Sequence, residues 1–145
     1  MVGNVGGIRI WSAFFVAYVG GTLALLFEST IGEWLGVYSP LLGYLQAEIY
    51  AGVPIGFVAA LASRTWRGLL MFVLGLMAAG ATLGVVIVIN GAGQASTIVV
   101  GTFYFAFWLG FLGVPTYAIV TSVVSVLRLM FPDRDPAASR RRKDR

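Results

Sequence analysis

The 145-residue chain contains no cysteine and no histidine, and only 11% of its residues are charged. Without cysteine the chain forms no disulfide, thiolate metal site or cysteine nucleophile. Without histidine it lacks the commonest general base and metal ligand. Glycine-rich phosphate loops, Ser/His/Asp sets and nucleic-acid-binding motifs are absent as well. The sequence therefore predicts a protein that is not an enzyme, needs no metal or cofactor, and binds no nucleic acid.

Apolar residues, by contrast, are abundant. They make up 59% of the chain, and the mean hydropathy is +0.89, far above the averages of soluble domains. The net charge of +4 does not come from basic residues spread evenly along the chain. Six of the ten basic residues lie in the last twelve positions, and the others flank apolar runs. This pattern is typical of a protein whose solvent is lipid.

Four apolar runs are long enough to cross a bilayer, since about 20 helical residues span a hydrocarbon core of about 30 Å. The runs cover residues 10–27, 40–62, 68–89 and 97–127. We therefore predict an all-α integral membrane protein, a four-span helical bundle within residues 1–131, followed by a polar basic tail at 132–145. Cleavage of the first run as a signal peptide after Ala24 is the alternative, but the run continues to Phe27 and further spans follow it.

Several local features define the ends of these spans. The segment 28–39 has helical apolar spacing and predicts a short interfacial helix. The connector 63–67 is so short that span 68–89 should return antiparallel beside span 40–62. Asn90-Gly91 is a typical helix stop, and Pro115 predicts a tilt or kink in the last span.

The ten basic residues would all lie on one side of the membrane. Arg9, Arg64, Arg67, Arg128 and the tail share that side, whereas the loops at 28–39 and 91–96 carry no basic residue. By the positive-inside rule, we expect a multi-pass protein of the cell membrane with both termini cytoplasmic. The basic run 140–143 either only fixes this topology or also binds anionic lipid or a partner.

Short matches between the two halves indicate an internal duplication. A shift of 60 places residues 20–27 on 80–87, and a shift of 61 places the Gly-Val-Pro at 52–54 on that at 113–115. Each half would then be one helical hairpin, and the two tandem hairpins would be related by an axis along the membrane normal. At the same shift Glu48 aligns with Leu109, so only one half carries the acid.

Small residues recur every four positions in three spans, 10–27, 40–62 and 68–89. Such stripes let helices approach closely, because packing drives helix association in lipid. The stripe residues predicted to pack helices are Gly52, Gly56, Ala60, Gly80 and Gly84. Their frequency could also reflect only the abundance of glycine in membrane spans.

Glu48 is an acid inside the run 40–62, four residues before the glycine stripe, and should point inward. Polar side chains at a similar depth are its candidate partners, namely Tyr18, Thr22, Thr82 and Tyr104. Glu48 has two possible roles. The structural role is that of a neutral acid that joins helices by hydrogen bonds, and the functional role is that of a proton or cation site. The aromatic block 103–108 could line an apolar ligand site, but lipid contact and packing explain it more simply.

Two hypotheses for function follow. The first is a structural or accessory membrane protein that packs with itself or with a larger membrane complex, so that its partners are membrane lipids, other copies or another membrane protein. The second is a small proton- or cation-coupled transporter or channel subunit that uses Glu48.

Overall fold

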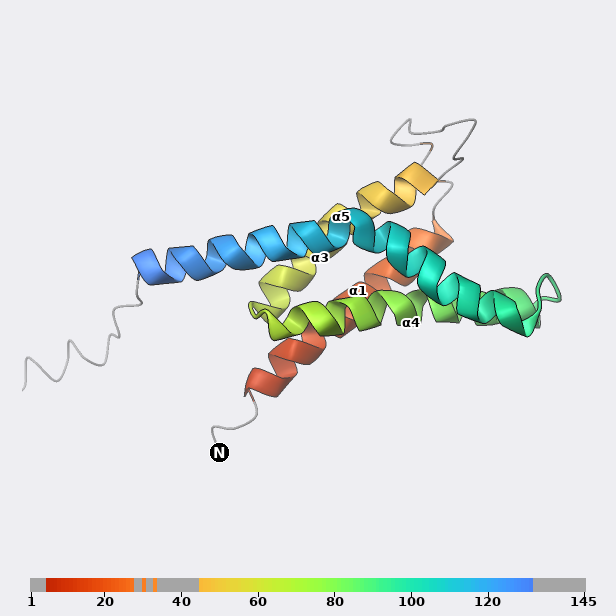
Figure 1. Cartoon of the computed structure of the whole chain (residues 1–145), viewed down its shortest axis with the longest axis horizontal. Coiled ribbons are helices and arrows are strands. Elements are labelled where there is room, and N and C mark those ends of the chain that lie inside the picture. Colours follow the sequence, from red (N-terminus) through yellow and green to blue (C-terminus); the bar gives the residue numbers. More distant parts are fainter. Residues whose placement is uncertain (1–4, 28–29, 31–32, 34–44, 132–145) are drawn as a thin grey trace, which may run out of the picture.

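The structure is a computed structural model that describes residues 5–27, 30, 33 and 45–131. In that part of the chain all long elements are helices: α1 (Val5–Leu26), α3 (Leu45–Ser63), α4 (Arg67–Ile89) and α5 (Ala95–Met130) (Figure 1). The all-helical prediction is confirmed. The predicted interfacial helix at 28–39 and the tail at 132–145 lie outside the described residues, apart from positions 30 and 33.

Three of these helices are long and apolar enough to cross a membrane, over Ile8–Leu26, Arg67–Ile89 and Ala95–Met130. They match the predicted spans 10–27, 68–89 and 97–127. The apolar part of α3, Glu48–Ser63, is shorter than a full crossing. Residues 40–44 of the second predicted span lie outside the described residues, so the fourth crossing stays a prediction.

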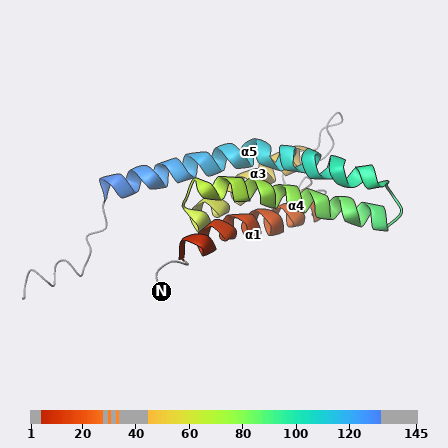
Figure 2. The ribbon, with the colours of Figure 1, turned by 60° about the horizontal axis from the view of Figure 1, so that its bottom comes forward.

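The helices pack in a closed ring in the order α1, α3, α5, α4 (Figures 1 and 2). Helices α3 and α5 run parallel, because Gly52 lies against Leu109 and Gly56 against Gly113. Helices α4 and α5 run antiparallel, since Gly80 lies against Gly101 and Gly84, further along α4, against Ile98, which comes earlier in α5. Helices α1 and α3 are in contact, and so are α4 and α5, as the helices of two hairpins would be.

Helix α4 does not pack along α3. It returns antiparallel from the short connector, but its main neighbours are α1 and α5, and the two helices diverge from their connector in Figure 1. The prediction that span 68–89 lies beside span 40–62 is wrong in this respect. The reason is that the glycine and alanine faces of α4 fit α1 and α5, and packing decides helix neighbours in lipid.

The ring does not confirm the internal duplication. A twofold axis along the membrane normal exchanges helices that lie diagonally opposite in a ring of four. The sequence matches would instead make α1 correspond to α4 and α3 to α5, and these pairs are neighbours. The duplication stays a prediction from the sequence.

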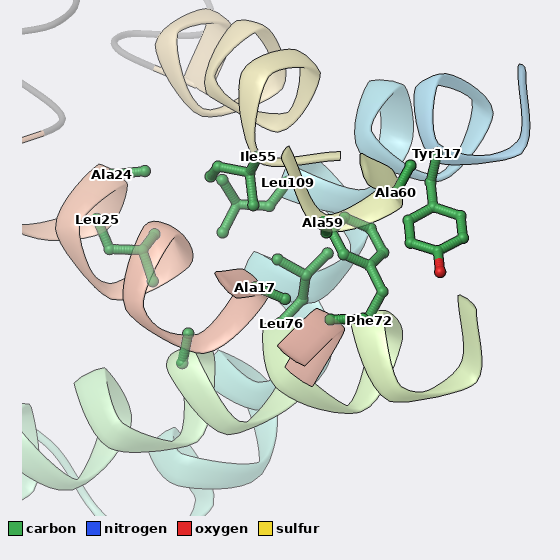
Figure 3. Close-up of a cluster of buried hydrophobic side chains, with 12 residues drawn as sticks. Ala17, Ala24, Leu25, Ile55, Ala59, Ala60, Phe72, Leu76, Leu109 and Tyr117 are labelled. Atoms are coloured by element: carbon green, nitrogen blue, oxygen red, sulfur yellow. The ribbon is translucent and has the colours of Figure 1, made fainter. Parts of the chain in front are cut away.

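One apolar cluster fills the centre of the ring (Figure 3). Its largest fully buried apolar side chains are Phe72, Leu76, Leu109 and Tyr117, drawn from α4 and α5, while α1 contributes mainly alanines such as Ala17. Alternation of large and small side chains lets neighbouring helices interdigitate. The interior of a single chain is therefore a packed core.

The ends of α4 and α5 follow from local sequence. The Asn90 amide and its side-chain Nδ2 both donate to the Val86 carbonyl, at 3.1 and 2.8 Å, and Gly91 has a φ of 74°. This confirms the predicted stop at Asn90-Gly91. Helix α5 begins two residues before the predicted Thr97, because Gln94 and Thr97 form a capping box.

Helix α5 changes direction near its middle, as Figure 1 shows. Pro115 lies inside the helix and has no N–H to donate to the carbonyl four residues earlier. The expected bend in the last span is therefore present.

Candidate functional site

Glu48 lies in the first turn of the described part of α3 and is 1% exposed. It shares one face of α3 with Gly52, Gly56 and Ala60, and all four residues are buried. The structure thus places the carboxyl group in the protein interior and not against lipid.

The described basic residues all sit at the other end of the helices. Arg9 lies near the start of α1, Arg64 and Arg67 at the connector that follows α3, and Arg128 in the last turn of α5. Since α3 and α5 run parallel, these positions are opposite to the end of α3 that carries Glu48. The one-sided basic charge expected from the sequence holds for this part of the chain.

Three of the predicted partners of Glu48 form a polar group between α1 and α4. The Tyr18 and Thr82 hydroxyls are hydrogen bonded at 3.2 Å, and Thr22 donates to the Tyr18 carbonyl at 2.7 Å. Thr82 also donates to the Ala78 carbonyl at 2.9 Å. The Tyr18–Thr82 bond joins the two helices, and the bonds of Thr22 and Thr82 within their own helices satisfy hydroxyl groups that lipid cannot solvate.

Tyr104, the fourth predicted partner, is not in this group. Its side chain is 41% exposed, and its ring meets Phe105 and Trp108 at centroid distances of 5.4 and 6.2 Å. Phe103 and Phe107 of the same aromatic block are 63% and 59% exposed. The block therefore lies largely on the outward surface of α5, where lipid contact explains it.

The predicted packing glycines all lie between helices of the same chain. A methyl group at Gly52 or Gly56 would collide with the α5 backbone, at Leu109 or Gly113. A methyl group at Gly80 would lie 2.6 Å from the Gly101 carbonyl oxygen, and one at Gly84 would lie 2.7 Å from Ile98 Cα. Ala60 is buried at 1% exposure. These faces are consequently filled within one chain.

A second polar cluster, absent from the sequence predictions, joins the α3–α4 connector to α5. The Tyr117 hydroxyl donates to the Thr65 carbonyl at 2.8 Å and is hydrogen bonded to the Ser63 hydroxyl, and both Tyr117 and Ser63 are fully buried. The Gly68 amide donates to the Thr65 hydroxyl at 3.3 Å. The sequence does contain one signal for the burial of Tyr117. Tyr117 follows Gly113 by four residues and therefore lies on the same buried face of α5.

Thr121 lies one turn beyond Tyr117 and is 1% exposed. Among the described residues its hydroxyl has no hydrogen-bond partner. It ends the buried face of α5, because the residues that follow it are exposed apart from half-buried Val124.

Among the described residues, few side chains that could bind a metal ion or a polar substrate lie close together. These residues include no group of three or more acidic, histidine or cysteine side chains that would hold a metal ion. A groove between α1 and α3 has a volume of about 500 Å³ and is lined by apolar residues such as Phe15, Val19 and Val58. A groove without convergent polar groups suits an acyl chain or another apolar surface better than a polar substrate.

No protein-family model, curated protein or solved structure matches this chain. The class is defined by the molecule itself: an all-helical protein with three helices long and apolar enough to cross a membrane, packed around an apolar core. A membrane location follows from those helices.

Proposed function

We propose that this chain is a structural or accessory membrane protein that packs with copies of itself or with a larger membrane complex. The observation that carries the proposal is the filled interior of the single chain. Phe72, Leu76, Leu109 and Tyr117 are buried to 1% exposure or less, and glycine contacts bring the helix backbones together around them. A packed core of this kind leaves the outer surface as the functional surface.

That outer surface is strongly apolar on every helix. Exposed large side chains include Phe15 and Leu23 on α1, Phe57 on α3, Leu70 on α4 and Phe111 on α5. Lipids cover such surfaces, and partner helices do so as well when shapes match. The small-residue faces already pack against helices of the same chain. We therefore place the association surface on the exposed apolar faces and not on the glycine stripes.

The particle mass of the purified protein in lipid nanodiscs tests this proposal. We expect more than one copy in each particle, or a partner membrane protein that co-purifies in fixed ratio from native membranes. A strict monomer without such a partner, measured both in nanodiscs and after cross-linking in native membranes, would contradict it.

A transporter or channel subunit is the second candidate, and the burial of Glu48 favours it. An acid inside a helical membrane protein is a candidate for proton or cation binding. A single chain has a packed core, so an ion path would have to form between copies. The transport candidate therefore requires self-association, whereas the structural candidate also allows a partner membrane protein, and ion flux is the property that separates them.

A further inference from the structure

The last part of α5 extends beyond the other helices, as Figures 1 and 2 show. Gly56 of α3 lies against Gly113 of α5, and the two helices run parallel. This register places Ser63, the end of α3, level with about Val120. The segment 121–130, about 15 Å of helix, therefore continues past the connector.

The connector marks the edge of the hydrocarbon. Arg64, Trp66 and Arg67 are all exposed there. If the hydrocarbon reached Met130, these two arginines would lie about 15 Å inside it, and charged side chains at such depth are costly. The α5 extension consequently lies outside the hydrocarbon, on the side of the membrane where the connector lies.

From Ile119, just before the α5 extension, to Met130 at its end, α5 has an apolar stripe with the spacing of a coiled coil. Ile119, Val123, Val126 and Met130 are separated by four, three and four residues, which is the alternation of core positions in a heptad. Their side chains are 62%, 51%, 52% and 66% exposed. At 100° per residue the stripe faces away from Thr121, whose side chain is buried against the bundle.

The positions that flank this stripe carry no charge. In the heptad they are Val120, Ser122, Leu127 and Leu129. Arg128 is the only charged residue of 119–130, and its heptad position lies opposite the core. Identical stripes can therefore meet without like-charge repulsion, which is the usual barrier to parallel pairing of a chain with itself.

We propose that the stripe Ile119, Val123, Val126 and Met130 pairs, parallel and in register, with the same stripe of a second copy in the same membrane. Two heptads pair weakly in free solution, but insertion in one membrane gives both copies the same orientation and raises their effective concentration. The inference rests on the proposed self-association and names its surface. It explains why an apolar helix continues beyond the hydrocarbon.

Single cysteines in the naturally cysteine-free chain test the pairing. In a parallel pair each Val126 meets its counterpart, and Cα atoms within about 7 Å of each other can be bridged. Under mild oxidation in native membranes, Val126→Cys should give disulfide dimers at least about ten times more efficiently than Ser125→Cys. Both positions are exposed on the same turn of α5, so the second variant controls for reactivity and expression.

Particle mass separates this inference from the proposed function. If wild type holds several copies while Val126→Glu becomes smaller and Ser125→Glu does not, the stripe is the interface. A second outcome would exclude the stripe but leave the proposed function standing. In that outcome wild type holds several copies, Val126→Cys does not cross-link, and Val126→Glu keeps the wild-type mass. A monomeric wild type would exclude the pairing, and it would exclude the proposed function as well if no partner membrane protein co-purifies. Equal cross-linking at positions 125 and 126 would also overturn the pairing.

Discussion

Among single residues, Glu48 distinguishes the two candidate functions. Its carboxyl group lies in the interior at 1% exposure, where a glutamine has nearly the same shape and hydrogen-bonding capacity but cannot ionise. We expect Glu48→Gln to fold and to keep the wild-type particle mass. In the transport candidate this variant loses proton or cation flux in proteoliposomes. In the structural candidate wild type and variant both lack such flux.

Glu33→Gln is the matched control for that experiment, because Glu33 is an exposed acid. Flux that persists in Glu33→Gln and disappears in Glu48→Gln would support the ion site. Equal flux in wild type and both variants would exclude Glu48 from transport.

Gly56 shows how little room the helix contacts leave. A methyl group there would collide with the backbone of Gly113, whereas one at Gly110 would lie 3.8 Å from its nearest side chains. We expect Gly56→Ala to lower the free energy of unfolding by about 1–3 kcal/mol through overpacking. Gly110→Ala should be neutral or stabilising by up to about 1 kcal/mol, because alanine favours helix. Chemical unfolding in detergent compares the two, and equal stabilities would contradict a tight α3–α5 contact.

At the scale of elements, the Tyr117 cluster fixes the connector to α5. Tyr117→Phe removes the hydroxyl that donates to Thr65 and bonds Ser63. We expect a loss of about 1–2 kcal/mol in the free energy of unfolding, since the buried Ser63 hydroxyl and the half-buried Thr65 carbonyl each lose a partner. Tyr104→Phe is the control, because Tyr104 is 41% exposed on the outer surface. A loss of the same size in both variants would mean that the cluster does not hold the connector.

Element ends were predictable where the signal is local. Helix α4 ends at Asn90 and Gly91 for local reasons. The Asn90 and Gly91 amides donate to carbonyls of the last turn, and Gly91 adopts a positive φ. The neighbours of α4 were not predictable from the short connector, because a tight turn brings only the helix ends together. Further along, the fit of Gly75 and Gly80 to α1 and α5 decided the packing.

For the whole molecule, the one-sided basic charge predicts orientation. Cysteines introduced at Gln94 and at Arg142 should react with membrane-impermeant maleimides from opposite sides of the membrane, with Arg142 on the cytoplasmic side. Gln94 is exposed between α4 and α5, and Arg142 lies in the basic tail outside the described residues. Reaction of both from one side would contradict the predicted topology.

The sequence by itself determined the all-helical membrane class and the positions of three spans, because apolar run length and charge asymmetry are properties of segments and the bilayer acts on segments. The inward direction of Glu48 also followed, since spacing of four on a helix fixes a shared face. Only the tertiary structure decided that Tyr18 meets Thr82, that Tyr104 faces outward and that Tyr117 reaches Thr65. These depend on which helices are neighbours and on their register, and that choice is made by close backbone contacts between segments distant in the chain.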